Sequence, residues 1–542
     1  MSASPASNPK SPDISEKNKK YDRQLRLWGD HGQASLEAAS VCLINATATG
    51  TEALKSLVLA GLGSFTIIDD KITTPEDIGN NFFLPSGCAG ECRGRAACRL
   101  LLELNPDVRG QHLPQPLHQL LDTEPDRLLG FGVVIATGLT EALLSRLSGL
   151  LWSHNTPLLV CQSYGLVGCM RLQVREHLVV ESHPDNEVPD LRLLRPFPAL
   201  AAFLEAQDLT TMERRAHGHT PYLVLLHAAL QRWRAAHDGA PPRTYREKKA
   251  FRDTLNELRL RTPEGTPELE ENFDEAERAV NTALVEPGVP DSVTALFSSA
   301  QCNSLTAKSD DFWVLARALQ EYVQSEGDGQ LPVRGPIPDM FSDSDRYIQL
   351  QNIYREEARR GAELVYRRVQ LLLESLGRPS DVISEEQVRQ FCRNTHALRV
   401  FQGTSVQEEL RQMRIPANET ALHLQNPDGQ LALYAMLRAA DRFWAEYSTA
   451  PGSEDGQVEA DVVKLKACLS RLLADWGCQN TVKDDYVQEF CRYGGSELHT
   501  VAAFIGGCAA HEVIKLVTGQ YAPIDNTFIY NGITSSSGTF RL

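Results

Sequence analysis

The stretch from Val41 to Asp69 has the residue order of a nucleotide-binding βαβ unit but lacks most of the glycines such a unit needs. An apolar strand leads into the turn Asn45-Ala46-Thr47-Ala48-Thr49-Gly50, and a helix, a second strand and Asp69 follow. Glycines are required at this turn because backbone N–H groups must approach the phosphates closely, and a Cβ atom blocks that approach. A nucleotide-binding fold that lacks its phosphate-binding glycines predicts a partner subunit rather than a stand-alone enzyme.

Length, charge and cysteine usage narrow the class of protein. A chain of 542 residues is expected to hold more than one domain. A net charge of −16 argues against nucleic acid and anionic membranes as general partners. No apolar run reaches the roughly 18 residues of a membrane span. Twelve scattered cysteines and an N-terminus of Ser, Pro, Asn and Lys predict reduced thiols in the cytoplasm or nucleus and a disordered tail over residues 1–20.

Periodicity predicts an α/β domain interrupted by helices. Strands at 40–46, 64–69, 132–136 and 157–161 alternate with helices at 51–60, 93–104 and 141–154, which is the pattern of a parallel, doubly wound sheet. Beyond residue 176 helical patterns dominate, at 312–323, 347–376, 431–447 and 458–476. A helix rich in small residues at 499–518 and a strand at 528–531 return to α/β character. The C-terminus is therefore expected to complete the sheet of the first part.

Two motifs at the ends of the chain resemble the ubiquitin-like activating enzymes, a family related to bacterial sulfur-carrier adenylating enzymes. The opening Tyr21-Asp22-Arg23-Gln24-Leu25-Arg26-Leu27-Trp28-Gly29 resembles the N-terminal signature of the family's non-catalytic half. The closing 506–515 segment, Gly-Gly-Cys-Ala-Ala-His-Glu-Val-Ile-Lys, resembles its late helix. Further matches are similar to the neddylation branch of the family and lie at 42–52, 80–84, 164–168, 181–186, 331–335 and 482–487.

The resemblance implies a fold and a division of the chain. The fold is a Rossmann-like pseudo-adenylation domain of the sulfur-carrier adenylating type with a large, mainly α-helical insertion. The domain would comprise residues 21–175 and 481–542. The insertion, residues 176–480, would correspond to the family's catalytic-cysteine domain without its cysteine.

The resemblance also implies a non-catalytic role within a larger enzyme. The chain would pair with a catalytic subunit and complete its adenylation site. The complex would adenylate a ubiquitin-like modifier, take it as a thioester and pass it to a conjugating enzyme, with cullins as final targets. ATP and magnesium would be bound by the partner subunit, and this chain would bind no cofactor or metal.

Arg23 is the one residue to which the resemblance gives a part in the chemistry. In the family, an Arg at this place reaches across the dimer as an arginine finger towards phosphates held by the catalytic partner. A permanently charged guanidinium would stabilise the negative charge that builds up when a carboxylate attacks the α-phosphate. The alternative is a local salt bridge with Asp22 or Asp30.

A proline-rich segment of the predicted insertion is the candidate partner interface. Its stiff backbone would lose little entropy on binding, and the alternative is an ordinary surface loop. The candidate residues are Leu331, Pro332, Val333, Arg334, Gly335, Ile337, Pro338, Asp339, Met340 and Tyr347.

The residues at the family's nucleotide positions argue against ATP binding by this chain. Asp69 matches the ribose-binding acid, but a cap of the strand end is the favoured interpretation. Lys71 stands where an Asp near magnesium is expected, and Gly79 and Asn80 replace an Asn–Arg pair that faces the phosphates. A Lys cannot ligate Mg²⁺, and an Asn cannot neutralise a triphosphate.

Cysteine chemistry is not expected either. No cysteine has the Pro-x-Cys-Thr setting of the family's thioester nucleophile. Cys302 is the least implausible reactive thiol, but inert packing is the more economical interpretation. Cys88, Cys92 and Cys98 cluster without a fourth ligand, whereas tetrahedral zinc needs four.

Three other functions remain open at this stage. The first is a stand-alone adenylating enzyme, which the missing glycines disfavour. The second is the equivalent subunit of the sumoylation branch, for which a shorter middle segment is expected. The third is an adaptor that binds membrane-protein tails, such as that of the amyloid precursor protein, with peripheral membrane association through that tail.

Overall fold

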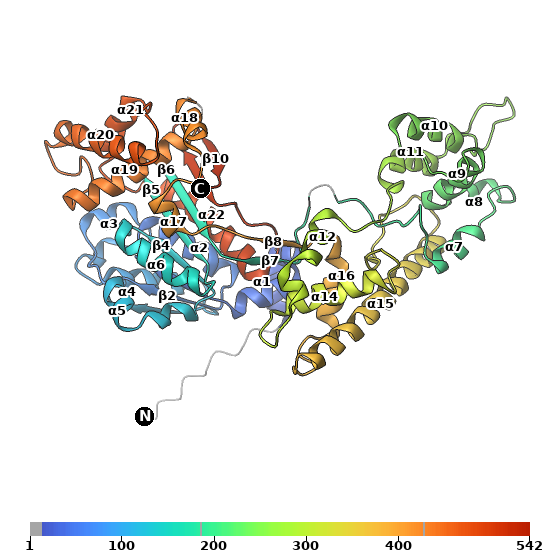
Figure 1. The fold of residues 1–542 in the computed structure, drawn as a ribbon, viewed down its shortest axis with the longest axis horizontal. Coiled ribbons are helices and arrows are strands. Elements are labelled where there is room, and N and C mark those ends of the chain that lie inside the picture. Colours follow the sequence, from blue (N-terminus) through green and yellow to red (C-terminus); the bar gives the residue numbers. More distant parts are fainter. Residues whose placement is uncertain (1–13, 185–186, 427–428) are drawn as a thin grey trace, which may run out of the picture. The chain divides into compact units, whose positions relative to one another are not determined.

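The computed structural model describes residues 14–184, 187–426 and 429–542, with side chains from residue 19 onward. The chain forms two compact units (Figure 1). The first unit contains the residues up to Val179 together with Val400–Leu542, and the second contains Val180–Arg399. Much of the predicted tail and residues 185–186 of the 181–186 motif lie outside the described residues. Residues 14–20 of the predicted tail are helical, since helix α1 spans Ile14–Ala38.

The first unit is built on a mixed sheet of eight strands. Their order across the sheet is β10-β9-β6-β5-β4-β1-β2-β3. The parallel half, β3 to β5, has the strand order 3-2-1-4-5 and confirms the predicted doubly wound fold. Strands β6, β9 and β10 extend it in antiparallel fashion, so the C-terminus does complete the sheet. The bounds are β1 Ser40–Ile44, β2 Ser64–Ile68, β3 Arg109–Leu113, β4 Val133–Thr137, β5 Leu158–Tyr164, β6 Val167–Gln173, β9 Thr527–Asn531 and β10 Ser536–Phe540.

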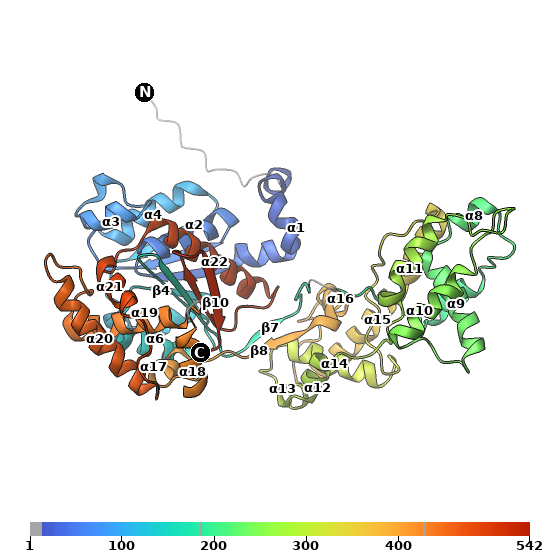
Figure 2. The same cartoon turned by 90° about the horizontal axis from the view of Figure 1, so that it is seen from above.

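Helices cover both faces of this sheet because successive strand residues are apolar on both sides. Val41 and Leu43 of β1 pack with one layer of helices, and Cys42 and Ile44 pack with the other. Figure 2 shows α2, α4 and α22 on one side of the sheet, with α6 and α19 (Leu431–Tyr447) on the other. The helices on these two faces are α2 Ala48–Ala60, α3 Pro75–Asn80, α4 Arg93–Leu104, α5 Leu117–Thr123, α6 Glu141–Ser153 and α22 His499–Thr518.

Helix α22 is a core helix despite its composition. It is long and apolar enough to cross a membrane by length and composition alone. Its buried residues Ile505, Ala509 and Val513 instead join the core formed with α2 and the sheet. A Cβ on Gly506 would lie 2.7 Å from the backbone nitrogen of Ala53, so the small residue permits close contact of α2 and α22, as the sequence predicts.

The second unit is shorter than the predicted insertion 176–480. Four helices within that range belong to the first unit: α17 Val406–Arg411, α18 Ala417–Gln425, α19 Leu431–Tyr447 and α20 Val458–Asp475; α21 Asp484–Tyr493, just beyond the range, belongs to it as well. The reason lies in α19, whose residues 431–440 are all buried between α20 and strand residues such as Val167 and Ile529. Periodicity predicts this helix but does not tell which core it joins.

The second unit is mainly helical, as predicted. Leu226, Phe251, Phe273 and Tyr354 are central to a core formed by α9, α10, α11 and the first part of α15. Phe312 of α14 meets Phe391 of α16 edge to face, 6.0 Å apart. The helices are α7 Pro198–Glu205, α8 Arg214–Gly218, α9 Tyr222–Ala236, α10 Tyr245–Asn256, α11 Glu271–Ala283, α12 Asp291–Ser298, α13 Ala300–Asn303, α14 Asp311–Gln324, α15 Ser344–Ser375 and α16 Glu385–Asn394. Two short strands, β7 His177–Val179 and β8 Arg399–Phe401, pair with each other and lie in the first unit except for Arg399.

Candidate functional site

The turn between β1 and α2 is closed by the chain's own hydrogen bonds. Asn45 adopts a positive φ of 65°, and its side-chain Nδ2 donates to the carbonyl oxygens of Thr137 (2.8 Å) and Gly138 (3.2 Å). Thr137 Oγ1 donates in return to the Asn45 carbonyl oxygen at 2.8 Å. These bonds join the carboxyl ends of β1 and β4, where open α/β sheets bind their ligands. The hydrogen bonds between Asn45 and residues 137–138 therefore span the crevice in which such sheets bind their ligands.

A carboxylate of the chain occupies the N-terminus of α2. Glu497 accepts hydrogen bonds from the backbone N–H of Ala48 (2.8 Å) and of Thr49 (3.4 Å). It also accepts from Thr49 Oγ1 at 2.6 Å and from Ser163 Oγ at 3.1 Å. The N-terminus of this helix is where a βαβ unit holds a phosphate, because free N–H groups and the helix dipole favour an anion. Glu497 takes the place of that phosphate.

The single glycine of the turn is retained for packing. A Cβ on Gly50 would lie 2.7 Å from Leu43 Cδ1 and 3.0 Å from the carbonyl oxygen of Asn45. Both neighbours belong to β1 and the turn that follows it. Gly50 is thus explained by the approach of α2 to the sheet, without a ligand.

Asp69 is buried and fully engaged at the end of β2. One carboxylate oxygen accepts from the Ala46 backbone N–H (2.8 Å) and from Arg93 Nε (2.7 Å), and the other accepts from the Lys71 backbone N–H (3.0 Å). Burial lowers the pKa of Arg93, but Asp69 and Asp77 outweigh it, so that the pKa of the guanidinium is raised overall. This geometry is that of the strand-end cap, the alternative to a ribose contact.

The other family positions lie before and at the end of helix α3. Lys71 is exposed, and Gly79 and Asn80 end helix α3. The neighbouring Asn81 is structural, since its Nδ2 donates to the Ala46 carbonyl oxygen (3.2 Å) and its Oδ1 accepts from Thr51 Oγ1 (3.1 Å). Over the described ranges, no group of three or more His, Cys, Asp or Glu residues is arranged to hold a metal ion.

Most of the cysteines are buried, whereas Cys92, Cys478 and Cys508 are partly exposed. Cys302 is buried in α13, and burial raises the pKa of its thiol to about 11, so it is not a ready nucleophile. Cys88 and Cys98 are buried as well. Burial also raises the pKa of Cys169, on β6, to about 12.

Arg23 projects from a helix that is anchored on either side of it. Tyr21 is buried, and its hydroxyl accepts from Asn105 Nδ2 at 3.0 Å. Trp28 donates to Gln33, which itself donates to the Ala60 carbonyl oxygen (3.1 Å). The Arg23 side chain is 85% exposed, and its nearest acidic contact is Asp22 at 3.9 Å. The guanidinium is therefore available to a partner, and the local salt bridge with Asp22 is marginal.

The predicted interface segment is partly buried within the second unit. Leu331, Pro332, Val333 and Gly335 are buried and offer no side-chain surface. Tyr347 lies partly exposed over the segment, with its hydroxyl 3.1 Å from Asp339 Oδ1. The remaining candidates, Arg334, Ile337, Pro338, Asp339 and Met340, are at least partly exposed.

One prediction concerns Glu497, which sequence reasoning missed. Glu497→Gln should lower the free energy of unfolding by about 1–2 kcal/mol, because the amide loses the negative charge and presents NH₂ to N–H donors. Urea denaturation measures the change, and Glu454→Gln, an exposed change of the same chemistry, is the control. Equal stabilities for the two variants would show that Glu497 does not stabilise the helix terminus.

Comparison with known proteins shows which class of domain the first unit belongs to. Residues 21–137, which include Arg23, the turn and Asp69, match the ThiF family. Enzymes of this kind adenylate their substrates with ATP and magnesium. The first unit is thus an adenylation-type domain, and its helix terminus is filled by Glu497.

The full-length relatives then give the particular family. The chain is 50% identical over 526 residues to the NEDD8-activating enzyme E1 regulatory subunit of Xenopus laevis, covering 97% of this chain and 99% of that protein. It is 45% identical to the Drosophila melanogaster protein of that name over the whole of both chains, and 27% identical to the Saccharomyces cerevisiae protein, covering 96% and 100%. The chain belongs to the NEDD8-activating enzyme E1 regulatory subunits.

This membership confirms the predicted neddylation branch and does not favour the alternatives. The chain is the non-catalytic subunit of an ATP-dependent activating enzyme, and a regulatory subunit implies a catalytic partner subunit.

Proposed function

We propose that this chain leaves nucleotide chemistry to its catalytic partner, which holds ATP and magnesium. The observation that carries the proposal is the filled α2 N-terminus, where Glu497 takes the donors that a phosphate would use. The engaged Asp69 adds to it, because a ribose hydroxyl would have to compete with Arg93 and two backbone N–H groups. A ligand here would have to displace a bound carboxylate and break a buried ion pair.

The chain's own contribution to chemistry is Arg23, acting in trans on the partner's phosphates. Its support is the long, exposed side chain on a helix held at Tyr21 and Trp28. A rigid base and a free guanidinium suit a group that must reach into another subunit's site without reorganisation. Arginine is suited to the task because it stays charged and can bind phosphate oxygens in two places.

The complex would then serve the modifier pathway that the family name implies. The modifier is adenylated at its C-terminal glycine, held as a thioester on the partner and passed to a conjugating enzyme and then to cullins. The exposed residues of the 331–347 segment contact a protein partner during these steps. A cytoplasmic or nuclear location fits reduced cysteines, and binding of the amyloid precursor protein tail is a separate, additional role.

The test is ATP–pyrophosphate exchange that depends on the modifier. The catalytic subunit alone should exchange slowly, and the two subunits together should exchange rapidly. This chain with the modifier but without the catalytic subunit should show no exchange. Exchange by this chain alone, or no rescue of the catalytic subunit, would contradict the proposal.

A further inference from the structure

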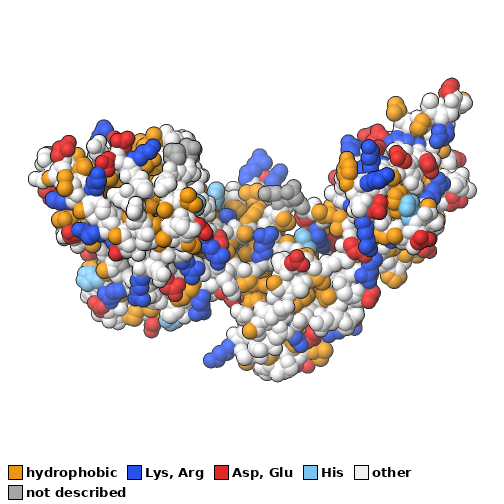
Figure 3. Space-filling model, turned by 45° about the horizontal axis from the view of Figure 1, so that its top comes forward, with side chains coloured by type: hydrophobic (Ala, Val, Ile, Leu, Met, Phe, Trp, Pro, Cys, Tyr) orange, Lys and Arg blue, Asp and Glu red, His pale blue; other side chains and the backbone are white. Residues whose placement is uncertain are grey.

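A basic pocket lies beside the predicted interface segment in the second unit. It has a volume of about 430 Å³ and is lined by Arg334, Gly335 and Ile337 of the segment, by Arg355 and Ala358 of α15, and by Arg393 of α16. Three arginines thus converge on one hollow. Positive and negative side chains are otherwise interspersed over the face drawn in Figure 3, and the chain as a whole has a charge of −16.

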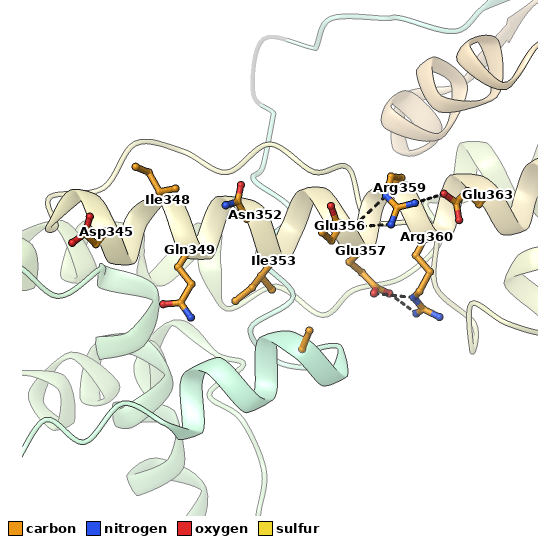
Figure 4. A pocket seen from close by; sticks show the side chains of 11 residues that line it. Asp345, Ile348, Gln349, Asn352, Ile353, Glu356, Glu357, Arg359, Arg360 and Glu363 are labelled. Atoms are coloured by element: carbon orange, nitrogen blue, oxygen red, sulfur yellow. Dashed lines mark hydrogen bonds and ion pairs between the residues drawn. The ribbon is translucent and has the colours of Figure 1, made fainter.

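Among the described residues, two of the three pocket arginines, Arg355 and Arg393, lack the carboxylate partners that neighbouring arginines have. Figure 4 shows Arg359, one turn further along α15, ion-paired with Glu356 and Glu363, and Arg360 similarly paired with Glu357. Those pairs neutralise their arginines within one helix.

Within the described ranges, Arg355 by contrast bonds only to the neutral Gln351, with 3.4 Å between Arg355 Nη2 and Gln351 Oε1. Arg393 is exposed and has no hydrogen bond or ion pair within the part of the chain that the structure describes. Arg334 is held by Glu187 at 2.8 Å and by the Val188 carbonyl oxygen at 3.1 Å. The pocket therefore carries two uncompensated positive charges next to an oriented third arginine.

The backbone of the segment adds hydrogen-bond donors. Among the described residues, the N–H groups of Gly335 and Ile337 have no hydrogen-bond partner. Pro336 and Pro338 stiffen the chain between and after them. Gly335, at a φ of +98°, is needed for close approach to α15, because its Cβ would lie 3.2 Å from that of Ala358. The segment is thus held in place with free donors beside the arginines.

We propose that this pocket binds acidic side chains of an extended segment in a protein partner. Arginine forms charge-assisted, bidentate bonds with carboxylates. The free N–H groups bind the carbonyl oxygens of an extended backbone, and Ile337 and Ala358 contact the methylene groups of a Glu side chain. The inference rests on the proposed interface role of 331–347 and names the chemistry of the partner.

The test uses the full chain and two labelled decapeptides, one alternating Glu and Ala and the other alternating Gln and Ala. Fluorescence anisotropy at low ionic strength should show saturable binding of the acidic peptide only. Arg355→Gln and Arg393→Gln should each weaken binding about fivefold. Arg367→Gln, the same charge change at an exposed position of α15 outside the pocket, should leave binding unchanged.

Two results would overturn the proposal. One is an equal loss of peptide affinity for Arg367→Gln, which would show that the effect depends on net charge and not on the pocket. The other is binding of a labelled single-stranded oligonucleotide with the same dependence on Arg355 and Arg393, which would assign the pocket to nucleic acid. Peptide binding does not involve adenylation, so its failure is separable from a failure to rescue pyrophosphate exchange.

Discussion

Replacing Arg23 with alanine should lower modifier-dependent ATP–pyrophosphate exchange by the activating complex about 100-fold. The loss follows from removing a charged donor that acts where negative charge builds up on the α-phosphate. Folding should be unaffected, because the Arg23 side chain is 85% exposed and its one acidic contact among the described residues is with Asp22 at 3.9 Å. The measurement compares initial exchange rates of wild-type and variant complexes at equal heterodimer concentration.

The matched control is Arg26→Ala, one turn further along α1. Arg26 is also exposed, but it is engaged with Asp22 at 3.3 Å. The Arg26→Ala substitution should change the exchange rate less than twofold, because a surface salt bridge contributes little free energy. Equal exchange by the Arg23→Ala and wild-type complexes, with normal assembly, would leave a scaffold role and remove Arg23 from the chemistry.

The second large effect is expected on stability, at Asp69. Asp69→Ala should lower the free energy of unfolding of the first unit by about 3–5 kcal/mol, because removing one partner of a buried ion pair leaves the other charge uncompensated. Arg93 would keep only Asp77 (3.1 Å), and the N–H groups of Ala46 and Lys71 would lose their acceptor. The decrease in the free energy of unfolding is measured by urea denaturation, with hydrogen exchange of the amides in β1 and β2 as the probe of the first unit.

The neighbouring carboxylate provides the comparison for Asp69. Asp70 is exposed, so Asp70→Ala should change stability by less than about 0.5 kcal/mol. If the Asp69→Ala and Asp70→Ala variants were equally stable, the ion pair between Asp69 and Arg93 would not stabilise the fold. A role for Asp69 in ligand binding would then have to be reconsidered.

Local sequence pattern was sufficient for four of the five strands of the parallel half of the sheet and for the helices between them, but it missed β3, a strand with little buried surface. Buried strands such as β1 and β4 are short apolar runs bounded by turns, and the intervening helices have apolar faces at helical spacing. The absence of glycines at 45–49 also singled out this turn from the sequence alone. This was possible because the requirement for small residues next to a bound phosphate concerns only the residues of the turn itself.

Long-range relations could not be predicted in this way. Glu497 meets the N-terminus of α2 from about 450 residues away in sequence, at 2.8 Å from Ala48 N, and no local pattern marks a glutamate that will replace a phosphate. Helix α19 looks like any helix of the predicted insertion, yet it packs on the sheet of the first unit. The motif at 331–335 predicts an interface segment, but it does not predict that Val333 is buried in the core that α9 and α11 form.

The most direct test of the account is equilibrium titration of the isolated full-length chain with Mg²⁺-ATP, alongside the assembled heterodimer. The account predicts no saturable binding to the isolated chain and one nucleotide per heterodimer, because Glu497 takes the N–H donors that a phosphate would need and Arg93 engages Asp69, the acid that would bind ribose. Saturable one-to-one binding by the isolated chain, lost on mutation of Asp69 or of the turn 45–50, would contradict it.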